Sequence, residues 1–106
     1  MDKSDNSDLT DMSETYSVDA LLQTAVEFHN TGNLDKAEEL YRKILENDPK
    51  NPNVLHLLGF LAHQLGFGEE GLALIKEAIS YMPDIALFHS NLAKVCLAIK
   101  DLEQAE

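Results

Sequence analysis

The sequence predicts an all-α protein built from antiparallel helix pairs. Apolar residues recur at three- and four-residue steps, as they do along one face of a helix. Pro49 and Pro83 stand one 34-residue period apart and interrupt this pattern. Small residues follow the same period, at Ala25, Gly59 and Ala93 and again at Ala37, Gly71 and Ala105. An internal period of 34 residues with helical patterning is typical of stacked helix–turn–helix repeats.

The first predicted pair covers about residues 18–31 and 34–47. The apolar face of its first helix consists of Leu21, Leu22, Ala25, Val26 and Phe28. The matching face of its second helix consists of Leu34, Ala37, Leu40, Tyr41 and Ile44. Gly32 lies between them and can adopt the left-handed backbone that ends a helix without a Cβ clash. An antiparallel hairpin of two helices follows.

Later helices are predicted at about residues 53–65, 69–81 and 86–99, with a sixth beginning near Asp101. Pro49 and Pro83 cannot continue a helix, so each ends the second helix of its pair. The small residues of each pair are expected to face each other and to let two backbones approach closely. Gly68 and Gly71 are expected to weaken the fourth helix by roughly 1 kcal/mol each relative to alanine.

These features resemble the tetratricopeptide repeat family, whose pattern is W-x2-L-G-x2-Y…A-x3-F…P. The first repeat, 18–51, matches with Leu21, Ala25, Phe28, Ala37, Tyr41 and Pro49. The second, 52–85, matches with Leu55, Leu58, Gly59, Ile75 and Pro83. The third, 86–106, is truncated and keeps Leu92, Ala93 and Ala105. The resemblance implies a right-handed solenoid whose first helices line an inner groove.

Residues 1–17 have a different composition, with few large apolar groups. Their acids are Asp2, Asp5, Asp8, Asp11 and Glu14. We expect a disordered acidic leader. The sequence contains neither a secretion signal nor an apolar stretch long enough for a membrane span, so a cytoplasmic protein without membrane contact is expected.

The net charge of −11, from 19 acids and 8 bases, disfavours nucleic acid as a partner. Acids on the predicted second helices are expected to form a solvated outer face. We therefore expect the partner to be a protein or a peptide.

The resemblance places peptide binding on the first helix of each repeat. The groove candidates are Leu22, Val26, His29, Asn30, Asn53, His56, Phe60, His63, Gln64, Ser90, Asn91 and Lys94. They mix apolar side chains with hydrogen-bonding groups, which suits an extended or helical peptide. A clamp for a terminal carboxylate is not expected, because Leu22, Val26, Leu57 and Leu87 occupy the matching places.

The truncated third repeat is also expected to leave an apolar face uncovered. Its candidate residues are Leu92, Val95, Ile99 and Leu102. An uncovered apolar face on such a chain usually marks an interface. We therefore expect homo-oligomerisation through residues 86–106.

No catalytic residue, metal ligand or cofactor site is predicted, and we expect no enzymatic activity. His56 and His63 stand two turns apart, about 10.5 Å at 1.5 Å per residue, which is too far to share one ion. His89 is expected to pack in the place of a leucine, and Cys96 to lie in the core as a small hydrophobe.

Two alternatives stay open. The segments LHLLGFLAHQLG and LFHSNLAKVCLAIKDLEQAE resemble the arrays that precede glycosyltransferase or sulfotransferase domains of bacterial proteins, including O-GlcNAc-transferase-like ones. The chain would then be the recruiting arm of a larger enzyme. In the other alternative, the repeats form a purely structural solenoid whose groove stays empty.

Overall fold

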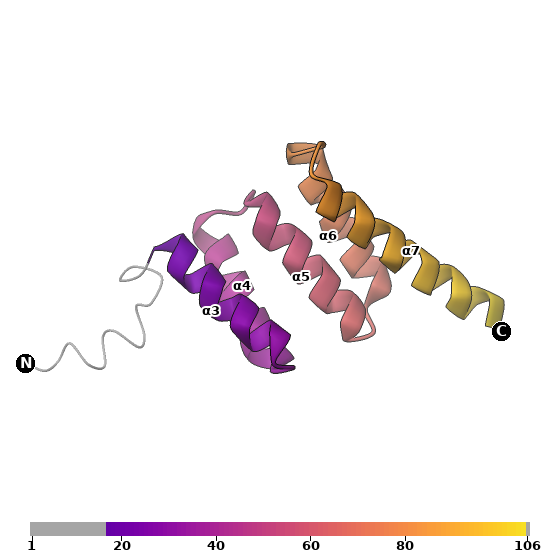
Figure 1. The fold of residues 1–106 in the computed structure, drawn as a ribbon, viewed down its shortest axis with the longest axis horizontal. Coiled ribbons are helices and arrows are strands. Elements are labelled where there is room, and N and C mark those ends of the chain that lie inside the picture. The colour runs from indigo at the N-terminus through magenta and orange to yellow at the C-terminus, as the bar shows by residue number, and fades with distance from the viewer. Residues whose placement is uncertain (1–16, 106) are drawn as a thin grey trace, which may run out of the picture. The chain divides into compact units, whose positions relative to one another are not determined.

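A computed structural model describes residues 17–105, and every regular element in that range is a helix (Figure 1). The helices are α3 (Val18–Asn30), α4 (Leu34–Asn47), α5 (Pro52–Gln64), α6 (Gly68–Tyr81) and α7 (Ala86–Ala105). The prediction of an all-α fold is confirmed, and the first four helices agree with their predicted bounds to within one residue. The predicted leader lies outside the described residues, apart from Ser17.

The chain divides between Asn47 and Asp48 into two compact units. The first unit contains the helix pair α3 and α4. Ser17 begins α3, and its hydroxyl accepts a hydrogen bond from the backbone N–H of Ala20 at 3.1 Å, as at many helix starts. The small residues of this pair, Ala25 and Ala37, are both fully buried.

Each hairpin turn depends on a glycine in the left-handed region, Gly32 with φ 86° and Gly66 with φ 98°. The two turns have the same hydrogen bonds, one period apart. The N–H groups of Asn33 and Phe67 reach back to the carbonyls of Phe28 (2.9 Å) and Ala62 (2.8 Å). Any other L-residue at these two glycines would be strained.

The second unit contains α5, α6 and α7. Asn51 begins α5 by accepting from the N–H of Val54 at 3.1 Å, and Pro52 takes the first helical position. Within the unit α7 lies against α5 and α6 (Figure 1). The core of this unit consists of Val54, Leu55, Leu58, Leu61, Ala62, Ile75, Ala78, Phe88 and Val95.

The predicted break before a sixth helix is wrong, because α7 continues without interruption to Ala105. Lys100 stands one period after Gly66, where the earlier repeats have their turn glycine. A lysine at that position favours the helix, and neither glycine nor proline follows it before Ala105. Ala93 and Ala105 therefore belong to one helix and cannot face each other, and Ala93 is exposed.

Candidate peptide-binding surface

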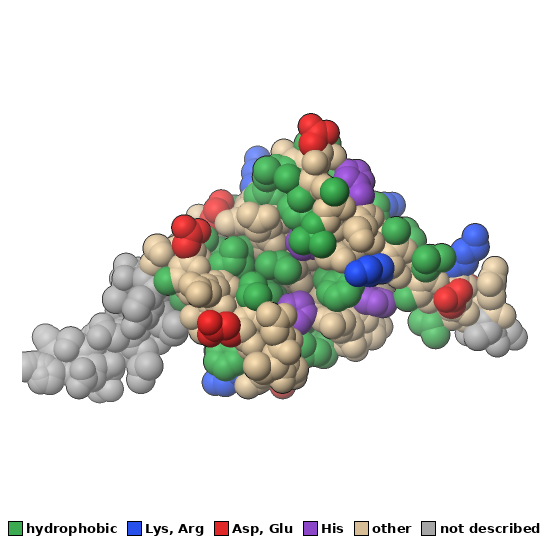
Figure 2. Space-filling model, viewed as in Figure 1, with side chains coloured by type: hydrophobic (Ala, Val, Ile, Leu, Met, Phe, Trp, Pro, Cys, Tyr) green, Lys and Arg blue, Asp and Glu red, His purple; other side chains and the backbone are tan. Residues whose placement is uncertain are grey.

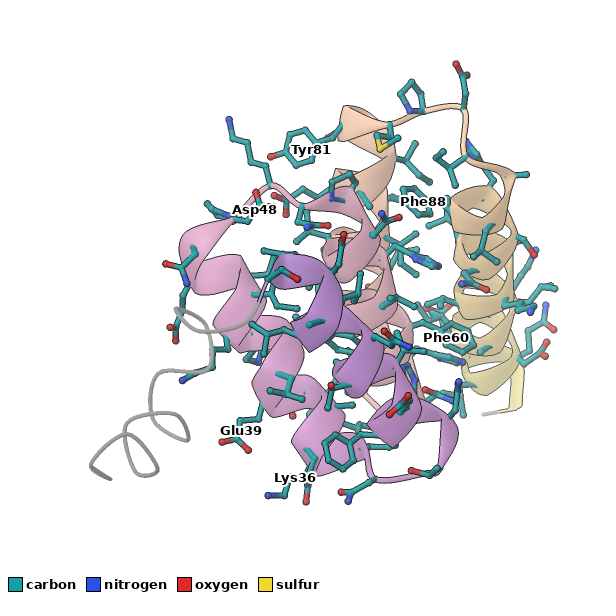
Figure 3. All side chains as sticks on the ribbon, turned by 60° about the vertical axis from the view of Figure 1, so that its left-hand side comes forward. Lys36, Glu39, Asp48, Phe60, Tyr81 and Phe88 are labelled. Atoms are coloured by element: carbon teal, nitrogen blue, oxygen red, sulfur yellow. The ribbon has the colours of Figure 1, made fainter. Side chains whose placement is uncertain are left out.

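The junction of α5 and α7 contains a buried polar pair. His56 of α5 and Asn91 of α7 are 2 % and 7 % exposed, and Asn91 Nδ2 lies 2.5 Å from His56 Nε2. The ring of Phe88 stacks on the imidazole, with the centroids 4.6 Å apart. Figure 3 shows Phe88 between α7 and the other two helices of the unit. This cluster holds α7 against α5.

Burial lowers the pKa of His56, and a smaller opposing effect comes from its hydrogen bond to the backbone of Asn53. The neutral imidazole suits both contacts. Its Nε2 accepts from the Asn91 amide, which leaves the Nδ1 proton for the Asn53 carbonyl. No buried side-chain nitrogen or oxygen within the described residues lacks a partner. His56 and Asn91 are predicted to line the groove, but both are buried and hydrogen-bond to each other.

A second, accessible cluster joins the same two helices. Phe60 of α5 is half-buried, and its ring centroid lies 5.6 Å from that of His63, one turn further along. Lys94 of α7 places its Nζ 6.0 Å from the centroid of the Phe60 ring. Phe60 points toward α7 in Figure 3. Three of the predicted groove residues therefore meet at one place.

Apolar and polar groups flank this cluster. Leu87 and Leu97 of α7 are 57 % and 61 % exposed. Ser90 of α7 and two α5 residues, Asn53 and Gln64, are exposed as well. We call Phe60, His63, Gln64, Ser90, Lys94 and the two leucines the α5–α7 surface.

The candidates in the first unit lie on α3. Leu22, Val26 and His29 are half-buried and Asn30 is exposed. His29 Nδ1 lies 2.9 Å from the hydroxyl of Tyr41 on α4, and the two rings meet edge to face. Tyr41 is fully buried, and burial raises its pKa to about 12. This contact ties the two helices of the unit together.

Two comparisons with known proteins find similarity over part of the chain. A family model described as tetratricopeptide repeat matches residues 18–61. That segment is similar to tetratricopeptide repeats, and it contains α3, α4 and most of α5. The chain is also 38 % identical over 52 residues to the BBSome complex member BBS4 of Bos taurus. That match covers 49 % of this chain and 10 % of the relative, so the chain spans about a tenth of the relative's length.

The predicted resemblance to the tetratricopeptide repeat family is thereby confirmed, and such repeats generally mediate protein–protein interaction. The narrower resemblance to transferase arrays stays a prediction. Among the described residues no helix has the length and apolarity to cross a membrane. No group of three or more potential metal-ligating side chains comes together in that part of the chain either.

In the predicted third repeat, 86–106, the prediction of an uncovered face is partly wrong. Val95 is fully buried, and Leu92 and Ile99 are half-buried, because this side of α7 packs on its own unit. A Cβ on Gly68 of α6 would meet Ile99 Cγ1 at 3.1 Å. Leu102 is 71 % exposed and is the one of the four candidates that lies open.

Two other placements are also wrong, for one reason. Cys96 and His89 are exposed, although the repeat register predicts that both are packed. The second helix of a pair would cover them, but residues 86–105 form one helix that does not fold back. His89 instead donates from Nε2 to the carbonyl of Pro83 at 2.7 Å, and Phe88 fills the core.

Proposed function

We propose that this chain is a binding module that holds a peptide segment of a partner protein on the α5–α7 surface. The observation that supports the proposal most directly is the exposure of Leu87 and Leu97, 57 % and 61 %, which precede and follow Lys94 along α7. Exposed apolar groups mixed with hydrogen-bonding groups are the combination that peptide recognition needs. In this function the chain catalyses no reaction.

The partner's contact would combine two kinds of interaction. Apolar side chains of the peptide would cover the two leucines and the open edge of the Phe60 ring. Its backbone would exchange hydrogen bonds with polar side chains such as Ser90 and Gln64. The buried His56–Asn91 pair joins α5 and α7, so these helices are already fixed before the peptide arrives. The protein therefore loses little conformational entropy on binding, which favours affinity.

The test is selection of peptides from a random displayed library on the full chain, followed by fluorescence anisotropy with a synthesised binder. The double variant Phe60→Ala/His63→Ala should abolish binding, while its circular dichroism remains that of the parent. The matched control is Lys36→Ala/Glu39→Ala on α4, where both side chains are exposed and point outward from that helix in Figure 3. Unchanged binding by the α5 variant would exclude this surface.

Self-association through residues 86–106 is a second candidate. Its support is Leu102, 71 % exposed, together with the exposed side chains of Ala93 and Cys96 on α7. The relative's description as a member of a complex is consistent with a role in assembly. Sedimentation equilibrium of the full chain should show a dimer or larger species that Leu102→Glu weakens. A strictly monomeric mass at high protein concentration would contradict this candidate.

A further inference from the structure

Negative charge is absent from the two helical segments that form the α5–α7 surface. Residues 52–64 and 86–100 contain no aspartate or glutamate, although the chain has 19 of them and a net charge of −11. The same segments contain Lys94, Lys100 and three of the four histidines. Acids of this unit lie instead on α6, in the segments before α5 and α7, and at the carboxyl end of α7, at Asp101 and Glu103. The surface is thus the non-acidic face of an acidic chain.

The same distribution is visible on the molecule. Over α5 and α7, Figure 2 shows hydrophobic, histidine and lysine side chains beside one another. Along α7, acidic side chains appear in that view at the loop before the helix and near its carboxyl end. An approaching segment therefore meets a positive charge within an apolar surface.

Lys94 is the charged group at the centre of this surface. Its Nζ lies over the Phe60 ring at 6.0 Å, and within the described residues it makes no ion pair. An ammonium over an aromatic face keeps N–H donors directed toward solvent. A carboxylate that joins it there would be less screened than at an open surface, because Phe60 and Leu97 exclude part of the water.

We infer that the partner segment recognised here is acidic, with an aspartate or glutamate on Lys94 and a large apolar side chain beside it against Phe60 and Leu97. The inference rests on the proposed function and adds the chemistry of the ligand. Charge complementarity argues for this occupant, since a basic segment would meet Lys94 with like charge. The two lysines of these segments, Lys94 and Lys100, supply too little positive charge to bind a nucleic acid.

The experiment measures fluorescence anisotropy of the full chain with labelled peptides of one length. The peptides share two leucines and one phenylalanine, and their remaining positions carry glutamate, glutamine or lysine. We expect the glutamate peptide to bind tightest, to lose affinity as salt is added, and to bind Lys94→Gln about threefold more weakly. Lys94→Glu should weaken it further. The control is Lys76→Gln, the same charge change on the exposed side of α6.

The outcomes separate the inference from the proposed function. Equal binding of glutamate and glutamine peptides, sensitive to Phe60→Ala but not to Lys94→Gln, keeps the binding surface and overturns the acidic partner. Binding that Phe60→Ala/His63→Ala leaves unchanged overturns both. Self-association weakened by Lys94→Glu, with no peptide bound, would assign the surface to a second copy. The last outcome is peptide binding that appears only after Asp2, Asp5, Asp8 and Asp11 are replaced by Asn. It would show that the chain's own amino terminus occupies the surface and competes with the peptide.

Discussion

The backbone carbonyl of Gly59 occupies the place where a Cβ on Gly71 would stand. The relationship is mutual, because a Cβ on Gly59 would lie 2.8 Å from the carbonyl oxygen of Gly71. The atoms that would be displaced belong to the backbone and cannot rotate away as a side chain can. α5 and α6 therefore meet backbone to backbone at this point.

Gly71→Ala should lower the free energy of unfolding by about 2 kcal/mol, the scale of overpacking in a dense core. Helix propensity alone predicts the opposite sign, a gain of about 1 kcal/mol. Urea unfolding followed by circular dichroism measures the difference. The control is Gly68→Ala, whose new Cβ would meet the movable Ile99 side chain at 3.1 Å and should cost less. A Gly71→Ala variant as stable as its parent would show that the helices can separate without cost.

The stability of the second unit should fall as the solution is acidified. The folded state holds His56 neutral, with its pKa below the ordinary 6.5, whereas the unfolded chain takes up a proton at that value. Stability is therefore fully present above about pH 6.5 and is lost as the pH falls from there through the folded-state pKa.

Urea titrations at several pH values measure this loss. The double variant His56→Leu/Asn91→Leu removes both polar partners together and should remain folded with a flatter pH profile. An identical profile in parent and variant would show that His56 is not the group that titrates.

The first unit should be sensitive to alkali instead. Tyr41 has a pKa raised to about 12 by burial, so the folded state resists its ionisation. Its contribution to stability is complete below about pH 10 and is lost as the pH rises toward 12. Tyr41→Phe should remove this alkaline loss and cost about 1 kcal/mol at neutral pH through the missing hydrogen bond to His29. Ultraviolet difference titration of the phenols, parent against variant, checks the assignment.

The continuity of α7 should depend on Lys100. Lys100→Gly places a glycine at the register of Gly32 and Gly66. It should destabilise the helix at this point by about 1 kcal/mol, so that residues 101–105 become less helical. NMR chemical shifts of residues 101–105 report this directly. Lys100→Ala removes the same charge and keeps the helix. If both variants leave those shifts unchanged, packing rather than residue type fixes the helix.

Local signals in the sequence were sufficient for most of the fold. The apolar steps, the turn glycine Gly32 and the prolines Pro49 and Pro83 each act on a few neighbouring residues, so helix bounds follow from them. Gly66, the second turn glycine, is known from the structure. The course of α7 after Lys100 does not follow from them. The repeat register predicts a turn at this position, whereas the helix propensity of lysine favours the continuous helix that the structure has. The same register predicts packed positions for Cys96 and His89, which are exposed on α7.

The candidate site could be predicted in outline. Phe60, His63 and Lys94 were all among the groove candidates, since the first helices were expected to carry them. Which candidates are accessible depends on how α7 rotates against α5, and no periodicity in one helix specifies that rotation. His56 and Asn91 look like surface polar groups in a sequence, but they satisfy each other in the interior. Phe88 carries no signal beyond its apolarity.

Cys96 gives this protein a practical property. It is the one cysteine of the chain, and it lies exposed on α7. A maleimide dye or nitroxide spin label would therefore attach at one known position without any engineered residue. Such a probe would lie on α7. A loss of its mobility would report a peptide or a second copy that binds next to it. The same thiol can also join two copies by air oxidation, so association must be measured in the presence of a reductant.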